Sequence, residues 1–84
     1  MQADWSVYII KCSDDSLYTG ISTDVERRFQ QHLKGKGAKY FRSRQPLCIV
    51  YQEKGYSRAD ASRRECGIKK LSRSKKMMLI MLDA

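Results

Sequence analysis

Several kinds of segment are missing from this chain. No apolar stretch approaches the length of a membrane span, and the first residues, MQADWS, carry neither a basic nor an apolar leader region. No internal repeat, linker or low-complexity stretch interrupts the 84 residues. We therefore expect one small cytoplasmic domain over residues 1–84, with no membrane partner and room for one complex site.

Cysteines are few and far apart. Cys12, Cys48 and Cys66 are odd in number and widely spaced, which indicates no disulfide framework. With His32 they could supply four zinc ligands, but the close C-x₂₋₄-C pair of structural zinc sites is absent. We expect three reduced cysteines that serve as small apolar residues.

Positive charge is in excess. The chain has 17 Lys+Arg against 9 Asp+Glu, which gives a formal net charge of +8. This excess predicts a polyanionic partner, with nucleic acid ahead of a membrane surface. The alternative is a basic surface that only aids solubility.

The hydrophobic pattern predicts an α+β fold in the order ββαβαα. Two β-rich runs, SVYIIKC and LYTGI, flank the turn residues SDDS, so residues 5–22 are expected to form a β-hairpin. The run LCIVYQE predicts a third strand over residues 47–53. We expect one three-stranded antiparallel sheet flanked by helices.

Three helices are predicted from caps and apolar spacing. In TDVERRFQQHLKG, Thr23 is a good N-cap, Glu26 completes a capping box and Gly35 ends the helix. Its apolar residues at i, i+4 and i+8 predict a buried stripe: Val25, Phe29 and Leu33. Ser57 starts the second helix, and Ser74 caps a third, apolar helix, SKKMMLIML.

Glu65 interrupts the inward stripe of the second helix, between Ala61 and Ile68. A buried carboxylate is costly unless it is paired, hydrogen-bonded or bound to a metal. Glu65 is therefore either one half of a structural ion pair with a nearby arginine, or a ligand of a hard cation or a general acid or base.

Arg28 and His32 flank the apolar stripe of the first helix. Arg28 can lay its stem on the core with its head in solvent, or it can bind a phosphate with two hydrogen bonds. His32 is either a half-buried helix residue or a group that transfers a proton or contacts phosphate. A Ser-His-Asp triad lacks the glycine pattern of a nucleophile elbow.

The segment KGKGAKYFRSRQP is predicted to be a basic loop or short helix. Its aromatic residues Tyr40 and Phe41 lie among four basic residues: Lys36, Lys39, Arg42 and Arg44. GKGAK lacks the GxxxxGK[ST] spacing of a P-loop.

Together these patterns resemble the GIY-YIG nuclease family, and in particular its small single-domain bacterial members of the UPF0213 type. VYI at 7–9 is similar to the first signature element and YTG at 18–20 to the second. Arg28 falls ten residues after Tyr18, as the family's helix arginine does, and Glu65 matches the metal-binding glutamate. GKGAKYFRS is similar to a loop of the small members.

The resemblance implies a nuclease that hydrolyses phosphodiester bonds with one Mg²⁺ or Mn²⁺ ion held by Glu65 and no organic cofactor. Tyr8 or Tyr18 would orient or deprotonate the attacking water, and Arg28 would stabilise charge on the phosphate. His32 lies where some homing endonucleases of the family carry a histidine.

The same resemblance implies DNA, or RNA, as the partner. Four basic residues would track its backbone, with Tyr40 or Phe41 stacked on an unpaired base: Lys36, Lys39, Arg42 and Arg44. We expect cleavage directed by structure or single strands, as in DNA repair, because no appended DNA-binding domain is present to read sequence.

One geometric condition applies to the two tyrosines. If Asp14 and Asp15 form a two-residue turn, Tyr8 and Tyr18 project from opposite faces of the hairpin. Both serve one site only with a bulge or an offset turn, so we predict an irregularity between Ser13 and Gly20. Gly20 is expected to let substrate or helix backbone approach.

The chain departs from the family in two respects. The first signature element lacks its glycine, since Ser6 and Val7 precede Tyr8. The incision subunit of bacterial excision repair and similar members carry an asparagine twelve residues after the glutamate, where this chain has Met77. Lys75 or Lys76 could substitute for it. The alternative hypothesis is a non-catalytic nucleic-acid-binding module that retains the nuclease scaffold.

Overall fold

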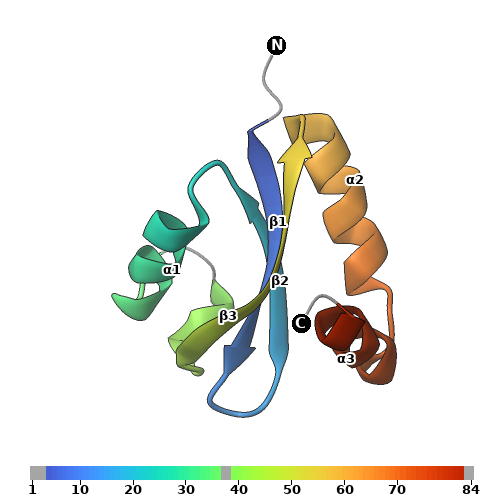
Figure 1. The fold of residues 1–84 in the computed structure, drawn as a ribbon. Helices are drawn as coiled ribbons and strands as arrows, with labels where there is room; N and C mark the ends of the chain where they lie inside the picture. The colour runs from blue at the N-terminus through green and yellow to red at the C-terminus, as the bar shows by residue number, and fades with distance from the viewer. Residues whose placement is uncertain (1–3, 37–38, 83–84) are drawn as a thin grey trace.

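The computed structural model describes residues 4–36 and 39–82 as a sheet with helices on both faces (Figure 1). The elements in chain order are β1 (Trp5–Cys12), β2 (Leu17–Ser22), α1 (Val25–Leu33), the short 3₁₀ helix η1 (Lys39–Arg42), β3 (Pro46–Tyr56), α2 (Arg58–Lys69) and α3 (Arg73–Leu82). The predicted α+β class and ββαβαα order are confirmed, and η1 is the short helix expected in the basic segment. β3 is longer than the predicted 47–53.

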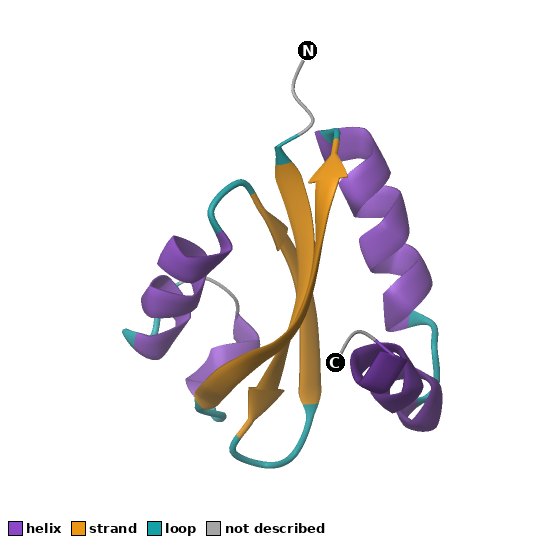
Figure 2. Ribbon diagram, viewed as in Figure 1, coloured by secondary structure: helices purple, strands orange, loops and turns teal. Residues whose placement is uncertain are grey.

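The sheet is antiparallel in the order β2-β1-β3, so β1 is its central strand. One face is covered by α1 and η1 and the other by α2 and α3 (Figure 2). Val7 and Ile9 pack on the α2 face, whereas Tyr8 and Ile10 pack on the α1 face. This double burial explains why the run VYII is apolar at every position instead of alternating.

The hairpin between β1 and β2 closes through three residues. The N–H of Cys12 donates to the carbonyl oxygen of Ser16 at 3.0 Å, which leaves residues 13–15 as the loop. Asp15 has φ of 69°, the left-handed conformation that such loops require at one position and that aspartate tolerates. The hairpin therefore has an offset turn, one of the two irregularities predicted, and not a two-residue turn.

This loop length places the two tyrosines on the same face. Tyr8 lies opposite Gly20 and Tyr18 lies opposite Ile10. The pairing runs without a shift from Lys11 to the end of the hairpin, so the predicted irregularity is confined to the loop.

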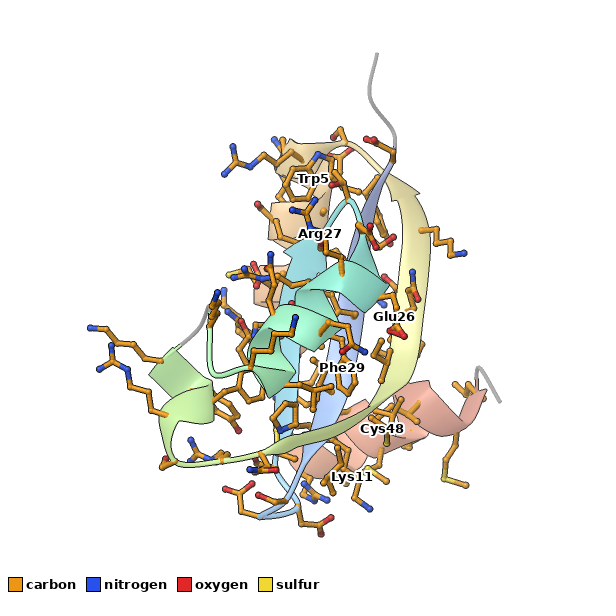
Figure 3. All side chains as sticks on the ribbon, turned by 90° about the vertical axis from the view of Figure 1, so that its left-hand side faces the viewer. Trp5, Lys11, Glu26, Arg27, Phe29 and Cys48 are labelled. Atoms are coloured by element: carbon orange, nitrogen blue, oxygen red, sulfur yellow. The ribbon has the colours of Figure 1, made fainter. Side chains whose placement is uncertain are left out.

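The bulges occur instead between β1 and β3. Tyr51 lies opposite Ile9, but Ile49 lies opposite Ile10, so one extra residue is inserted in β3. As a result Tyr51 packs on the α2 face and Ile49 on the α1 face, although they are two residues apart. β3 bends around the sheet in Figure 3.

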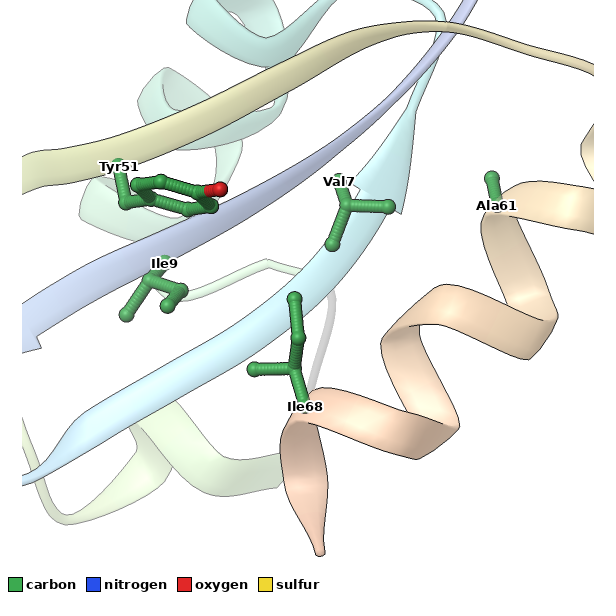
Figure 4. Close-up of a cluster of buried hydrophobic side chains, with 5 residues drawn as sticks. All are labelled: Val7, Ile9, Tyr51, Ala61 and Ile68. Atoms are coloured by element: carbon green, nitrogen blue, oxygen red, sulfur yellow. The ribbon is translucent and has the colours of Figure 1, made fainter. Parts of the chain in front are cut away.

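Two hydrophobic cores result, one on each face of the sheet. The core under α2 contains Val7, Ile9, Tyr51, Ala61 and Ile68, which point toward one another in Figure 4. The inward positions predicted for Ala61 and Ile68 are confirmed, since both are fully buried. The core under α1 contains Tyr8, Ile10, Cys12, Val25 and Phe41.

The three cysteines are free, but they do not share one environment. Cys12 is buried and serves as a small apolar residue, as expected, because it lies on the central strand. Cys48 and Cys66 are exposed, so the prediction of an apolar role is wrong for both.

The N-cap of α1 is Asp24 and not the predicted Thr23. The Asp24 carboxylate accepts the N–H of Arg27 at 3.1 Å, which leaves no capping box for Glu26. The predicted end at Gly35 is confirmed: its φ of 76° is the left-handed conformation that closes a helix.

Two other details of the helices also differ from prediction. Leu33 is 47% exposed, because the inward position near the end of α1 is taken by His32. α3 begins two residues earlier than predicted: the hydroxyl of Ser72, not that of Ser74, accepts a main-chain N–H at the helix start, from Lys75.

Gly20 is required by the side chain of Tyr8, not by an approaching backbone. A Cβ at position 20 would lie 2.6 Å from the Tyr8 Oη atom and 2.7 Å from its Cζ atom. We expect Gly20→Ala to lower the free energy of unfolding by about 1–3 kcal/mol, since Tyr8 is packed in the core and cannot yield easily. Urea denaturation measures this change.

Gly67→Ala is the matched control. Gly67 lies in α2 with nothing within 4 Å of an added Cβ, so alanine should stabilise the helix by about 0.5–1 kcal/mol. Equal stability of the Gly20→Ala and Gly67→Ala proteins would contradict the close approach of Tyr8 and Gly20.

Candidate active site

The two tyrosines of the hairpin meet a histidine and two aromatic residues of η1. The Tyr8 hydroxyl and the His32 Nε2 atom are 3.1 Å apart and share a hydrogen bond. Tyr18 contacts His32 edge to face at 5.5 Å, and its ring lies 5.2 Å from Tyr40 and 4.8 Å from Phe41. We call Tyr8, Tyr18, His32, Tyr40 and Phe41 the aromatic cluster.

The two phenols of this cluster differ in accessibility. Tyr8 is 1% exposed, whereas Tyr18 is only partly buried. Burial raises the pKa of Tyr8 well above its ordinary value of about 10, and burial also raises the pKa of Tyr18. Both phenols therefore stay protonated near neutral pH, and Tyr18 is the one that solvent or a substrate reaches.

His32 is held as a neutral ring. Burial lowers its pKa, and the positive charge of Arg28 acts in the same direction, against a smaller opposite effect of the Lys36 main chain. Within the described residues its Nδ1 atom is buried and makes no hydrogen bond. The interaction with Tyr8 through Nε2 therefore anchors the ring.

Arg28 lies beside the cluster on α1. Its Nη1 donates to the side-chain oxygen of Gln31 at 3.0 Å, which orients the guanidinium along the helix. Its positive charge lowers the pKa of both Tyr8 and Tyr18. Arg28 is thus close enough to the phenols to bind an anion in front of them.

Glu65 lies on α2 near enough to the two phenols to act on them electrostatically. Its negative charge raises the pKa of both Tyr8 and Tyr18, although α2 packs on the other face of the sheet. The sheet ends at β2, so groups from both faces can meet beside this edge strand. The carboxylate is 21% exposed and forms an ion pair with Lys69 at 3.3 Å.

The orientation of α2 is fixed by a network next to Glu65. Arg64 donates two hydrogen bonds to the Glu53 carboxylate on β3, at 2.9 and 2.8 Å. Tyr51 and Tyr56 donate to the same carboxylate. Arg64 and these hydroxyls lower the pKa of Glu53 to about 2, so the link between α2 and β3 persists at neutral pH.

Of the carboxylates in the described residues, Glu65 is the one that acts on both phenols, and it suits a divalent cation. Among residues 4–36 and 39–82, no three His, Cys, Asp or Glu side chains are grouped as a protein-made metal cage requires. Mg²⁺ commonly binds through one or two carboxylates and completes its shell with water and substrate phosphates. A single carboxylate on a partly exposed side chain, paired with an exposed lysine, fits this mode.

The basic segment divides into free and engaged side chains. Lys36, Lys39 and Arg42 are exposed, as a surface that binds nucleic acid requires. Arg44 instead pairs with Asp14 at 2.5 Å and lies over the Tyr40 ring at 4.2 Å. This pair ties η1 to the hairpin loop and thereby holds Tyr40 beside Tyr18.

Two details of the sequence-based site are corrected. Phe41 is 6% exposed within the α1 core, so it cannot stack on a base, which leaves Tyr40 as the aromatic residue able to do so. The ion-pair partner of Glu65 is Lys69, one turn along its own helix, and not an arginine.

Sequence analysis missed three groups that support this site. Gln31 lies three residues after Arg28, and Lys69 lies four residues after Glu65, so helical spacing alone indicates both contacts. The pair between Asp14 and Arg44 spans thirty positions and left no local signal.

The neutral state of His32 predicts a dependence of stability on pH. The folded protein holds the pKa of His32 below its ordinary value of about 6.5, so the unfolded chain binds a proton more readily. The free energy of unfolding should therefore fall as pH decreases through about 6.5, with a slope of at most about 1.4 kcal/mol per unit. Denaturant titrations between pH 7.5 and 5.5 measure this slope.

His32→Gln is the control for this slope. His32 is the chain's single histidine, so the variant should show a flatter profile over the same range, whatever its absolute stability. An unchanged slope in the variant would show that His32 is not held neutral.

The chain is similar to known proteins over most of its length. A model of the GIY-YIG catalytic domain matches residues 4–78. A UPF0213 protein of Staphylococcus haemolyticus is 53% identical over 74 residues, which cover 88% of this chain and 90% of that protein. A UPF0213 protein of Cupriavidus necator is 49% identical over 78 residues, or 90% of this chain and 85% of that one.

Solved structures agree as well. The solution NMR structure of a UPF0213 protein from Bacillus halodurans is 47% identical, covers 93% of this chain and 83% of its own, and superimposes with a TM-score of 0.59. Within the described part of the chain, no helix is both long and apolar enough to cross a membrane. The resemblance noted in the sequence is confirmed, and the chain belongs to the GIY-YIG family of nuclease domains, which act on nucleic acids.

Proposed function

We propose that this protein is a divalent-metal-dependent endonuclease that hydrolyses phosphodiester bonds in DNA beside the edge strand β2. The observation that carries the proposal is the convergence of five side chains from four elements: Tyr8, Tyr18, Arg28, His32 and Glu65. Two phenols, a guanidinium, a neutral imidazole and a carboxylate supply hydrogen bonds, positive charge and a ligand for a hard cation.

Glu65 would hold one Mg²⁺ or Mn²⁺ ion, which would polarise the scissile phosphate and stabilise the leaving oxygen. Arg28 would bind the non-bridging phosphate oxygens with its fork of donors, so that it stabilises the negative charge that grows during attack. Gln31 keeps this guanidinium in place through its hydrogen bond.

The tyrosines would have separate roles. Tyr18 is accessible and would orient the attacking water through its hydroxyl, while Tyr8 is buried behind it and positions His32. The raised pKa of both phenols makes a free tyrosinate base unfavourable at neutral pH. The attacking water therefore loses its proton only where the positive charge of Arg28 or of the cation stabilises the negative charge that results.

The surface favours a substrate with unpaired bases. Lys36, Lys39 and Arg42 are exposed next to Tyr40, so they can follow a phosphate backbone while one base stacks on the ring. This combination of a basic surface and a stacking ring supports recognition of structure or single strands. Cleavage of such DNA belongs among the reactions of DNA repair.

Glu65→Gln tests the catalytic proposal. We expect the wild-type protein to cut labelled single-stranded, duplex or branched DNA with Mg²⁺ or Mn²⁺, and the variant to bind the same DNA but cut at least about a hundredfold more slowly. Gel assays of cleavage and anisotropy assays of binding give the two rates and affinities.

Glu26→Gln is the matched control, because Glu26 is an exposed carboxylate in the first turn of α1. It should cut at the wild-type rate. If the wild type binds every substrate and cuts none, the chain is a non-catalytic binding module. Met77, a partly exposed apolar residue on α3 in place of the usual asparagine, is the observation that favours that alternative.

The separate roles of the tyrosines are tested by single hydroxyl deletions. Tyr18→Phe should slow cleavage by about a hundredfold with little change in stability, because its hydroxyl faces the substrate. Tyr8→Phe should lower the free energy of unfolding and slow cleavage less, because it removes the hydrogen bond to His32.

Tyr56→Phe is the control for this pair, since its hydroxyl binds Glu53 outside the cluster, and the two hydrogen bonds from Arg64 to Glu53 that hold α2 remain in this variant. It should keep the wild-type cleavage rate. A larger loss of cleavage in Tyr8→Phe than in Tyr18→Phe would contradict the assigned roles.

A further inference from the structure

A second polar site lies beside the proposed active site. An open pocket of about 430 Å³ is formed where β2 ends, between α1 and the first turn of α2. Six of its lining residues matter here: Trp5, Asp24, Arg27, Arg28, Gln31 and Arg58. We call this space the Trp5 pocket, and Figure 3 shows Trp5 and Arg27 at the same end of the molecule.

The charge of the pocket is positive. Three guanidinium groups line it against one carboxylate, that of Asp24. The Asp24 carboxylate is already used, because it caps α1 by accepting the N–H of Arg27. Arg27 and Arg58 are exposed, so their donors are available to an anion.

An aromatic face accompanies this charge. Trp5 is partly buried, with its inner side against the α2 core. The Arg58 guanidinium lies over its ring at 5.5 Å from the centroid. Indole and guanidinium together are the pair of groups that bind a base and a phosphate of one nucleotide.

Arg28 connects the pocket to the active site. The same guanidinium that lines the pocket acts electrostatically on Tyr8 and Tyr18. Tyr40 contacts Tyr18 near the start of β2, whereas Ile21 and Ser22 at the end of β2 line the Trp5 pocket. A strand that places one phosphate on Arg28 can therefore run along β2 from the basic segment to the Trp5 pocket.

We propose that the Trp5 pocket binds the nucleotide next to the phosphate held by Arg28, with its own phosphate on Arg27 and Arg58 and its base against the Trp5 ring. The proposal rests on the proposed function in one respect, that the ligand is nucleic acid. A free phosphate or a protein carboxylate would use the arginines alone and make no contact with the indole.

Trp5 is the chain's single tryptophan, so its fluorescence reports on this pocket directly. We would titrate the wild-type protein with a short oligothymidylate in EDTA, where metal-dependent cleavage is blocked. Saturable quenching is expected, whereas inorganic phosphate at the same phosphate concentration should leave the emission intensity unchanged. Dissociation constants, not amplitudes, are compared between variants.

Arg58→Ala and Arg27→Ala should each raise the dissociation constant by roughly tenfold. Both residues lie on the exposed surface. Arg63→Ala is the matched control: Arg63 is on the same helix but its side chain is 78% exposed and paired with Asp60. Its affinity should equal that of the wild type. Trp5→Phe keeps a ring and should retain most of the affinity, measured with a labelled oligonucleotide.

Equal affinities of Arg58→Ala and Arg63→Ala would overturn the proposal, as would binding by anisotropy without any change in Trp5 emission. These results are independent of catalysis. If no substrate is cut but quenching depends on Arg58, the pocket stands and the nuclease proposal fails. If cleavage depends on Glu65 but neither cleavage nor quenching responds to Arg58, the pocket alone is rejected.

Discussion

The site depends on the register of one hairpin. The hydrogen bond from Cys12 to Ser16 closes a loop of three residues, 13–15, in which Asp15 adopts a left-handed conformation. Because side chains alternate along a strand, this loop length decides that Tyr8 and Tyr18 share the face that α1 covers. A loop one residue shorter would turn Tyr18 toward α2, away from His32. The aromatic cluster therefore depends first on the geometry of the turn and only then on the packing of α1.

Much of the fold follows from local patterns. The hairpin, the caps at Ser57 and Gly35, and the inward positions of Ala61 and Ile68 are local signals that the structure confirms. Leu33 is a position at which such a local signal fails. Its spacing fits a buried stripe, yet His32 takes the inward position because a tyrosine from β1 provides a hydrogen bond there. Such a partner, twenty-four residues away in sequence, is invisible to helical periodicity.

The candidate site, too, could be predicted from the sequence only in part. The resemblance identifies the five residues that converge, but it does not say which tyrosine is buried, nor that Glu65 pairs with Lys69. The offset turn could be predicted only as a condition for a shared site, because hairpin loops of two to five residues are all common and SDDS alone does not select one length. The Trp5 pocket had no signal at all, since Trp5, Arg27 and Arg58 belong to three elements that only the tertiary fold brings together.

The tip of the hairpin is held by charges that lie in solvent. Asp14 pairs with Arg44, and Asp15 pairs with Arg73 of α3, all with side chains at least one-third exposed. Ions in solution screen such pairs, and the same ions weaken contacts to phosphate backbones. Added salt therefore acts twice, because it competes for the ligand and it also loosens the tie that keeps Tyr40 beside Tyr18. The ionic strength at which activity disappears therefore depends on how well the hairpin loop stays ordered, as well as on the protein's affinity for nucleic acid.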